Sequence, residues 1–340
     1  MKILFLLKKN LIYGSYNSVI AKSGLLNSAR ITAHQLHKHL GVKTEIEVCV
    51  DGNEVDKFLH KHKPKICVIE ALWVTPDKFK ELIVLHPKVL FVVLIHSEVP
   101  FLANEGNAIS WIYQYHHIER VFPSFNSKIT FEQFAQVGVA DLYLPNIYLD
   151  TEKKKKSDKK KCNEINIGCF GAIRPFKNQL IQAMAAIVYA DRNDLKLKFH
   201  MNTSRTEQGG GSVLKNIIAL FNNSHHRLIE HGWKDRDGFL CLLDKMDLCL
   251  QVSLSESFNI VVADAVHEYV PCVVSPTIDW MPSSQQVGTE DMEEIVRSIR
   301  DTLDSPNRVI RRSTKALEKY NKEALKTWEK FLDMVKSTHS

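Results

Sequence analysis

Short apolar runs alternate with amphipathic stretches along most of this 340-residue chain. The runs have the length and composition of strands buried on both faces, and the stretches between them repeat apolar residues at helical spacing. We predict strands at residues 3–7, 45–50, 65–69, 89–95, 165–170, 195–200, 227–230, 248–252 and 270–274. Helices are predicted at residues 25–40, 55–62, 76–85, 108–117, 179–190, 213–221 and 239–245, with a helical tail over 289–335.

The order of these elements predicts an α/β fold. Alternating strands and helices favour mostly parallel sheets with helices on both faces. Chains longer than roughly 250 to 300 residues usually divide into domains. We expect an N-terminal domain at residues 1–148, a lysine-rich linker at 149–164, a C-terminal domain at 165–320 and a final helix at 321–340.

The most informative stretch is residues 248–275, which is typical of a strand, a turn, a helix and a second strand. The turn at residues 253–259 then lies at the amino end of a helix, where free N–H groups and the helix dipole favour a phosphate. Glu256 and Asp264 are too far apart to hold one atom, but they suit hydroxyls at the two ends of an elongated ligand. The alternative is that they are a charge near the helix start and part of a solvated helix face.

A second candidate segment is the loop at residues 171–178, which opens the C-terminal domain. Gly171 permits a tight turn, and Arg174 and Lys177 place cations beside the start of a helix, where they suit a diphosphate. The alternative is an ordinary helix start with surface charges.

The carboxyl ends of the predicted strands add three further candidates. Ligands of open α/β sheets bind beyond these ends, and the rule selects Gly24, His96 and Gly232 in addition to the two segments above. If the two domains face each other, all of these positions line one crevice. An isolated histidine such as His96 more often has a structural or solvated role.

Taken together, the motifs resemble those of family 4 glycosyltransferases. The resemblance rests on Ser-x-Ser-Glu-Ser-Phe-Asn at residues 253–259, on Asp264, and on Gly-x-x-x-Pro-x-Lys-Asn at residues 171–178. Members of that family are retaining enzymes of the GT-B class, with two Rossmann-like doubly wound domains and a cleft between them. The resemblance is strong over the C-terminal domain and covers the N-terminal domain only in layout. It also implies a C-terminal helix that crosses back onto the first domain, with Trp328 where the family often has a tryptophan.

The resemblance implies transfer of a sugar from a nucleotide-sugar donor to a hydroxyl acceptor. The implied catalytic residues are Glu256, which would hold sugar hydroxyls, His96, which would touch the donor sugar, and Lys177, which would bind phosphate. The implied donor-binding residues are Gly24, Gly171, Arg174, Lys177, Gly232, Ser257, Phe258, Asn259, Ile260 and Asp264.

Several positions depart from the family pattern. Ala172 stands where the family has a phosphate-binding arginine, so Arg174 would have to replace it. Ser257 and Asn259 stand in place of two glycines, which puts the close backbone approach to the sugar in question. Asp264 replaces the family's second, longer acidic residue, which holds the ribose.

The implied mechanism needs no metal ion and no further cofactor. The acceptor attacks from the front face, and the leaving diphosphate itself accepts the proton. Asp235 and Asp237 form one Asp-x-Asp pattern, but their position in a charged turn before a helix favours capping over metal binding. Four histidine pairs show no acidic partner at ligand spacing and are assigned to solvated faces: His34 and His37, His60 and His62, His116 and His117, and His225 and His226.

The sequence leaves the acceptor open. Residues 8–30 mix basic and aromatic side chains, and residues 153–161 contain seven lysines. These segments suit a polyanion such as DNA carrying hydroxymethylated bases, which would require base flipping. The lysines also fit a solvated linker, and a saccharide or a lipid-linked acceptor is the competing prediction. A degenerate protein that binds a nucleotide sugar without turnover, and a sugar epimerase, are further alternatives.

The composition indicates the cellular compartment of the protein better than it indicates a binding partner. The net charge of +6 comes mostly from the lysine run, so it indicates little about nucleic-acid binding by the rest of the chain. The first residues do not form a signal peptide, and no apolar run is long enough to span a membrane. The seven cysteines form no C-x-x-C pair, and we expect reduced core thiols in a cytoplasmic protein.

Overall fold

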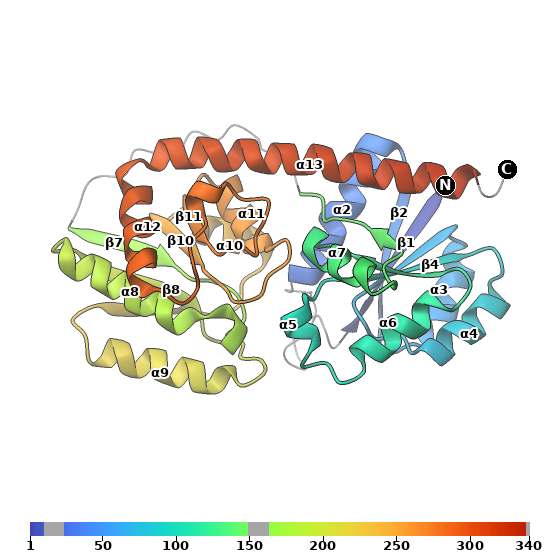
Figure 1. The fold of residues 1–340 in the computed structure, drawn as a ribbon, viewed down its shortest axis with the longest axis horizontal. Helices are drawn as coiled ribbons and strands as arrows, with labels where there is room; N and C mark the ends of the chain where they lie inside the picture. Colours follow the sequence, from blue (N-terminus) through green and yellow to red (C-terminus); the bar gives the residue numbers. More distant parts are fainter. Residues whose placement is uncertain (10–23, 149–162, 338–340) are drawn as a thin grey trace. The chain divides into compact units, whose positions relative to one another are not determined.

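A computed structural model describes residues 1–9, 24–148 and 163–337, and it divides the chain into two compact units. Unit 1 comprises Met1–Leu149 together with Tyr320–Ser340, and unit 2 comprises Asp150–Lys319. Each unit contains one parallel sheet with helices packed on it (Figure 1).

The sheet of unit 1 has the strand order β2-β1-β3-β4-β5-β6. Its strands are β1 (Lys2–Lys8), β2 (Lys43–Cys49), β3 (Ile66–Glu70), β4 (Leu90–Ile95), β5 (Val121–Phe125) and β6 (Leu142–Tyr143). Its helices are α2 (Gly24–Leu40), α3 (Glu54–His62), α4 (Pro76–Leu85), α5 (Val99–Leu102), α6 (Ala108–His116), α7 (Lys128–Gln136) and the end of α13 (Pro306–Ser337).

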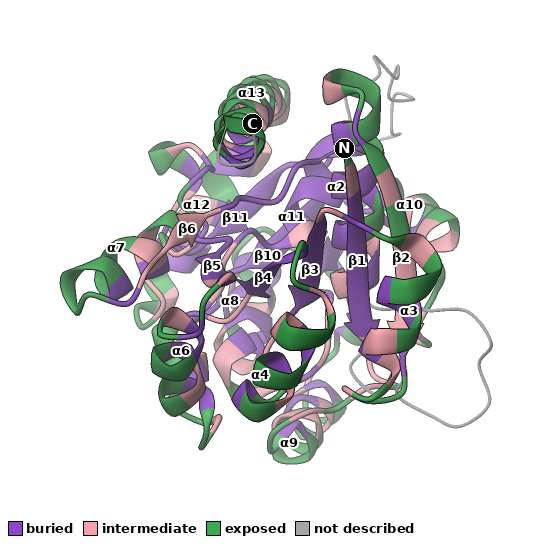
Figure 2. Ribbon diagram, turned by 90° about the vertical axis from the view of Figure 1, so that its right-hand side faces the viewer, coloured by how far each residue is buried: buried purple, intermediate pink, exposed green. Residues whose placement is uncertain are grey.

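The apolar runs of unit 1 form the central strands because both of their faces are covered. Strands β3 and β4 are buried at every position, and they pair in register from Ile66 with Leu90 to Glu70 with Leu94. Helices α3, α4 and α6 pack on one face, and α2 and the end of α13 pack on the other. Figure 2 shows the buried strands and the exposed outer sides of the helices.

The sheet of unit 2 has the strand order β11-β10-β7-β8-β9. Its strands are β7 (Glu164–Gly168), β8 (Lys196–Asn202), β9 (Arg227–His231), β10 (Leu248–Gln251) and β11 (Cys272–Val274). Its helices are α8 (Gln179–Arg192), α9 (Gly210–Asn222), α10 (Arg236–Leu243), α11 (Ile260–His267), α12 (Met292–Asp304) and the start of α13, with the 3-10 turns η1 (Pro175–Lys177) and η2 (Ser283–Gln285). Helices α8, α9 and α12 contribute to one apolar core with the strands.

The predicted α/β class with parallel sheets is confirmed, and each predicted strand is present within a few residues of its expected bounds. The helical tail consists of two helices, because Asp304 ends α12 and Pro306 begins α13. Proline is favoured in the first turn of a helix, where its missing N–H is not needed. No helix of the described residues is both long enough and apolar enough to cross a membrane.

The cysteines are mostly core residues. Among the described ones, Cys49, Cys67, Cys169, Cys249 and Cys272 are buried, and burial raises the pKa of Cys169 to about 12. Cys241 is exposed on α10, so the expectation of a core thiol is wrong for this position. Cys162 lies outside the described residues.

Trp328 anchors the end of α13 in the core of unit 1. Its side chain is fully buried, its indole N–H donates to the carbonyl oxygen of Pro145 at 2.8 Å, and its ring lies 6.4 Å from that of Phe5. Trp328→Ala should lower the free energy of unfolding by about 3 to 5 kcal/mol, because it leaves a cavity and a carbonyl without its donor.

Chemical denaturation measures this loss. Glu329→Ala, at the adjacent exposed position of the same helix, is the matched control and should change the free energy of unfolding by less than about 0.5 kcal/mol. Equal stability of the Trp328 variant and the control would contradict the anchoring role.

Candidate functional site

The centre of the unit 2 sheet is a point where the strand order reverses. Strand β7 has β8 on one side and β10 on the other, so the chain leaves β7 and β10 toward opposite directions of the sheet. Ligands of open α/β sheets bind at such a reversal, beyond the carboxyl ends of the strands. The loops after β7 and β10 contain residues 171–178 and 253–259, the two candidate segments of the sequence.

Hydrogen bonds join these two loops to each other. The N–H of Leu254 donates to the carbonyl of Phe176 at 2.9 Å, and the Asn178 side chain donates to the carbonyls of Val252 at 3.2 Å and Thr289 at 2.8 Å. The two loops therefore form one connected surface rather than two independent segments.

Lys177 and Glu256 meet at this surface as an ion pair. Their side chains are only 10% and 9% exposed, and the ammonium group contacts the carboxylate directly. The Arg174 guanidinium approaches the same carboxylate at 4.0 Å and the Glu207 carboxylate at 3.6 Å. A buried ion pair loses much of its Coulomb gain to desolvation, so stability alone is a weak reason for its presence.

Two special backbone conformations place Lys177. Gly171 has φ +116°, and a Cβ added there would lie 3.6 Å from the Cε atom of Lys177. Asn178, directly after η1, has φ +54° and is held by the two side-chain bonds described above. The glycine is thus required for its backbone angle, and Asn is one of the few other residues that tolerate a positive φ.

The turn before α11 keeps a glycine-like backbone without glycine. Asn259 has φ +52°, its side-chain oxygen accepts the Val262 N–H at 3.2 Å, and its side-chain nitrogen donates to Gln251 at 3.0 Å. This cap occupies one amino-terminal donor of the helix. The N–H groups of Ile260 and Val261 are the first-turn donors that no described residue takes up.

Phe258, in the same turn, packs against Trp280. Phe258 stacks on Trp280 with ring centroids 5.7 Å apart, and the Trp280 indole N–H donates to the Phe258 carbonyl at 2.8 Å. Ser257 lies between Glu256 and Phe258 on the same turn.

Asp264 is a buried residue in the middle of α11, and its ion-pair partner was not predicted from the sequence. Its carboxylate lies 2.8 Å from the guanidinium of Arg236, and only 4% of its side chain is exposed. Arg236 begins α10 between the two aspartates of the Asp-x-Asp pattern. Asp235 accepts the Gly238 N–H at 3.0 Å, so its predicted capping role is confirmed.

Gly232 follows edge strand β9, with β8 between that strand and β7. Its neighbour His231 stacks on His200 at a centroid distance of 5.2 Å, with 2.9 Å between the His231 Nε2 and His200 Nδ1 atoms. Burial, reinforced by the neighbouring His231, lowers the pKa of His200 to about 4.

In unit 1, a polar network lies at the carboxyl edge of the sheet and includes His96. The His96 Nε2 atom lies 2.5 Å from the carboxylate of Glu70, which ends β3 and is 1% exposed. The Asn126 side chain donates to the His96 Nδ1 atom at 3.1 Å and to the Asn146 side chain at 2.9 Å. Gly24, the other predicted unit 1 residue, begins α2.

Most histidine pairs have acidic partners, and the expectation that they lack them is wrong. His62 meets Glu47 at 2.7 Å and His116 meets Asp141 at 2.7 Å. His60 contacts Asp56, and both His225 and His226 contact Asp191. His226 is also buried rather than solvated. The partners of His62, His116, His225 and His226 come from other segments, so spacing along the chain did not show them, whereas Asp56 lies one turn before His60 on α3.

Comparison with solved structures identifies the fold. HepE from Anabaena, in complex with UDP and glucose, has a TM-score of 0.65 at 12% identity, covering 99% of this chain and 100% of that one. The N-terminal domain of Candida albicans trehalose-6-phosphate phosphatase has a TM-score of 0.70 at 11% identity, covering 100% and 97%. S. aureus TarM, as a mutant in complex with fondaparinux, alpha-GlcNAc-glycerol and UDP, has a TM-score of 0.62 at 14% identity, covering 82% of this chain. This chain spans 58% of the TarM chain.

No protein-family model matches the sequence, and no curated protein matches it. At identities of 11 to 14%, the structural likeness shows the fold alone. The predicted resemblance to GT-B glycosyltransferases is confirmed at that level. Residues 10–23 and 149–162, which include most of the basic loop and the lysine run, lie outside the described residues.

The His96 network predicts one tautomer. Because Nδ1 accepts the Asn126 amide, neutral His96 should carry its proton on Nε2 and donate it to Glu70. ¹⁵N chemical shifts of the imidazole nitrogens report this directly. A neutral His96 protonated on Nδ1 would contradict the assigned network, whereas Asn126→Leu should relax the tautomer preference.

The His200 pair predicts a pH dependence of stability. The folded pKa of about 4 lies below the ordinary value of 6.5, so the unfolded chain binds this proton more readily. The stabilisation that comes from neutral His200 is complete at pH values above its ordinary pKa of 6.5. It should be lost as the pH falls from about 6.5 toward about 4. Denaturation of the wild type and of His200→Gln at a series of pH values measures the difference. His225→Gln, at a largely exposed histidine, is the control, and an equal slope for all three proteins would contradict the prediction.

Proposed function

We propose that this protein is a retaining glycosyltransferase that uses a nucleotide-sugar donor and binds its diphosphate at the carboxyl edge of the unit 2 sheet. The observation that carries the proposal is the buried Lys177–Glu256 ion pair, which joins the two loops at the reversal of strand order. The GT-B fold and the UDP bound in HepE and in TarM support it.

The ion pair suggests how the site exchanges partners when the donor binds. The diphosphate takes over Lys177 and the N–H groups of Ile260 and Val261, where the helix dipole favours an anion. Glu256 loses its cation and becomes available to accept hydrogen bonds from sugar hydroxyls. The Arg174 guanidinium lies 4.0 Å from Glu256, and in this proposal it replaces the cation missing at Ala172.

In the transfer step, the bond from the anomeric carbon to the diphosphate breaks on the same face on which the acceptor oxygen bonds. The acceptor proton passes to an oxygen of the departing diphosphate, and Lys177 stabilises the charge that develops there. This step needs no metal ion. The implied contacts of His96 with the donor sugar, of Gly24 and Gly232 with the donor, and of Asp264 with the ribose stay predictions.

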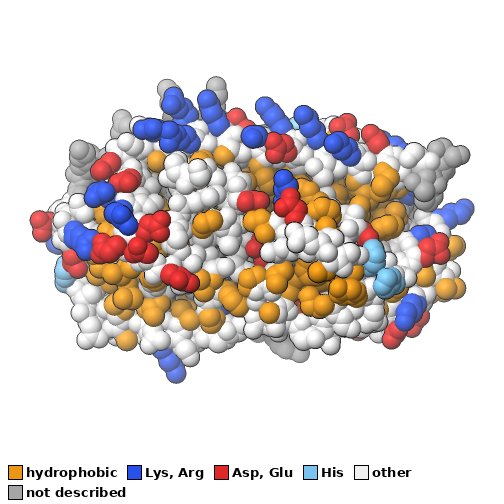
Figure 3. Space-filling view, viewed as in Figure 1, with side chains coloured by type: hydrophobic (Ala, Val, Ile, Leu, Met, Phe, Trp, Pro, Cys, Tyr) orange, Lys and Arg blue, Asp and Glu red, His pale blue; other side chains and the backbone are white. Residues whose placement is uncertain are grey.

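An anionic acceptor is favoured by a basic face on the unit 2 part of α13. Five exposed cations repeat there at helical spacing: Arg308, Arg311, Arg312, Lys315 and Lys319. Figure 3 shows Lys and Arg side chains gathered along α13. Such an array suits a phosphate-rich acceptor, including DNA with hydroxymethylated bases, because each neutralised phosphate releases counterions. Transfer to saccharides alone, with no salt-dependent DNA affinity, would replace this acceptor with a glycan.

The main alternative is a protein that binds a nucleotide sugar without turnover. The pairing of Arg174 with two glutamates favours it, because these carboxylates compete with a phosphate for the cation. Release of nucleoside diphosphate from a panel of donors separates the two functions. Free sugar or its epimer appearing without any acceptor would instead indicate an epimerase.

Calorimetric titration with nucleoside diphosphates tests the site itself. Lys177→Ala should weaken binding roughly 10- to 100-fold, the value of one hydrogen bond to a charged group. Lys198→Ala removes a lysine from an exposed ion pair with Glu164 in the same unit and should leave the affinity unchanged. Because Lys177→Ala leaves Glu256 buried without its partner, the neutral double variant Lys177→Met with Glu256→Gln checks that any loss is not misfolding. Wild-type affinity in the double variant would contradict the proposal.

A further inference from the structure

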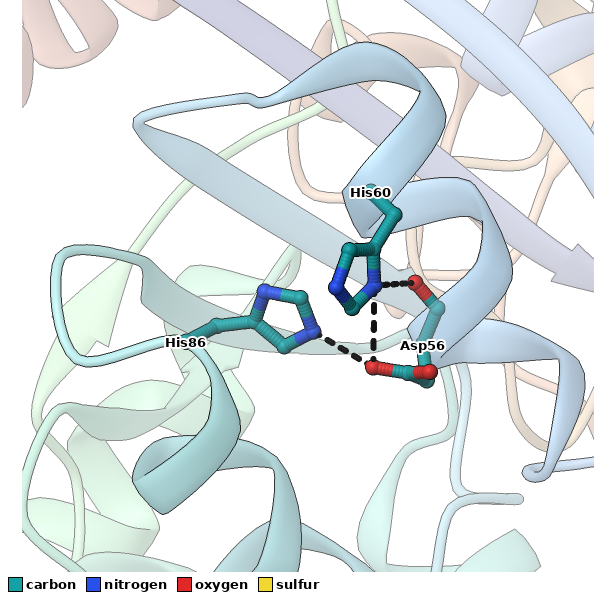
Figure 4. Close-up of side chains that lie close together, drawn as sticks. All are labelled: Asp56, His60 and His86. Atoms are coloured by element: carbon teal, nitrogen blue, oxygen red, sulfur yellow. Dashed lines mark hydrogen bonds and ion pairs between the residues drawn. The ribbon is translucent and has the colours of Figure 1, made fainter.

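Three potential metal ligands converge on the surface of unit 1. Asp56 and His60 lie one turn apart on α3, and His86 is the C-cap residue of α4. The Asp56 carboxylate oxygen lies 2.7 Å from the His86 Nε2 atom and 3.2 Å from the His60 Nδ1 atom. All three donor atoms lie within 4.8 Å of one another, and Figure 4 shows both rings directed at the carboxylate.

The fold fixes the ligand that is most distant in sequence. The backbone N–H of His86 bonds to the Leu82 carbonyl, and its own carbonyl accepts from the guanidinium of Arg120 at 3.1 Å. The same guanidinium binds the Ile83 carbonyl at 2.8 Å, so it ties down the end of α4. His86 is 10% exposed in its side chain, and the cluster opens to solvent on the side of His60.

The electrostatics of this place suit a cation. Both histidines lie at the carboxyl-terminal ends of their helices, where the helix dipoles are negative. The nearby lysines are paired with acids of their own: Lys61 with Glu47 at 2.6 Å, Lys78 with Glu81 at 2.6 Å and Lys57 with Glu54 at 3.9 Å.

We propose that Asp56, His60 and His86 bind a divalent transition-metal ion of the zinc class. Two imidazole nitrogens and one carboxylate oxygen form a common ligand set for this ion, with water in the fourth position. Ligands about 2.0 to 2.1 Å from zinc in a tetrahedron lie about 3.3 Å from one another. The two present separations from the Asp56 oxygen, 2.7 Å to His86 and 3.2 Å to His60, are close to this value.

A second group with the same residue types lacks the required lone pair. It consists of Asp191, His225 and His226 in unit 2. The Leu197 N–H donates to the His226 Nδ1 atom at 3.2 Å, so neutral His226 carries its proton on the Nε2 atom that faces Asp191. That nitrogen has no lone pair for a metal. In the first group, no described residue donates a backbone N–H to either histidine ring. The His60 Nδ1 atom lies 3.1 Å from the Asp56 carbonyl oxygen, so neutral His60 donates a proton there, and this proton must move to Nε2 when Nδ1 binds the ion.

The proposed ion has a structural role. Helices α3 and α4 run back from the carboxyl edge of the parallel sheet, so their carboxyl-terminal ends lie at the opposite edge from the His96 network. An ion at this place would link the two helices, because Asp56 and His60 of α3 and His86 at the end of α4 would all coordinate it. Zinc should therefore stabilise the protein without being needed for nucleotide binding.

The test is titration of the chelator-treated full chain with Zn²⁺, followed by calorimetry and thermal unfolding. We expect one tight site and a rise in Tm. His60→Ala, His86→Ala and the near-isosteric Asp56→Asn should each weaken the affinity at least roughly tenfold, the loss typical even of residues that only support a ligand. Co²⁺ should give the intense visible absorption of a tetrahedral site, and His86→Ala should abolish it.

Two matched variants serve as controls. His62→Gln changes the neighbouring histidine of α3, which contacts Glu47, and His225→Ala removes the exposed histidine of the second group. Both should keep the wild-type zinc affinity. Undetectable zinc binding, equal affinity in His86→Ala and wild type, or loss of the site in His225→Ala would overturn the proposal. Circular dichroism of each variant confirms that it is folded.

Discussion

The buried contact between the Lys177 ammonium and the Glu256 carboxylate is the interaction on which the account of unit 2 depends. It joins the loop after β7 to the loop after β10, where the strand order reverses. The positive φ at Gly171 and at Asn178 and the hydrogen bonds between the loops bring the two charges together. Desolvation offsets much of the attraction of such a buried pair, so stability alone is a weak reason for its presence.

Side-chain contacts also explain how the two loops keep their conformation where their residues differ from the family pattern. The family pattern has glycine where this chain has Asn259, yet Asn259 adopts a positive φ and caps the helix with its own side chain. The backbone conformation is therefore kept at the cost of one N–H donor. Arg174, two positions from the missing arginine at Ala172, directs its guanidinium at the same carboxylate as Lys177. The residues at these positions are therefore compatible with the anion site that we propose.

Much of the fold could be predicted from the sequence, because the strands buried on both faces are continuous apolar runs. Strand β5 was harder, since Pro123 interrupts its run, and β6 spans only Leu142–Tyr143. The convergence of residues 171–178 with residues 253–259 followed from the rule that ligand loops lie at the carboxyl ends of parallel strands. Ion pairs between different elements could not be predicted from the sequence. Arg236, Glu207 and Glu70 meet their partners from other segments of the chain, and the hydrophobic pattern does not show how those segments lie relative to one another. For the same reason, the sequence did not show that His86 lies beside Asp56 and His60 of α3.

The most direct test of the central claim is a crystal structure of the protein soaked with uridine diphosphate, the nucleotide bound in two of the compared structures. We expect the diphosphate to lie against the Lys177 ammonium and the N–H groups of Ile260 and Val261, with Glu256 turned away from the lysine. A diphosphate bound elsewhere on unit 2, or an unbroken Lys177–Glu256 contact at saturating nucleotide, would contradict it.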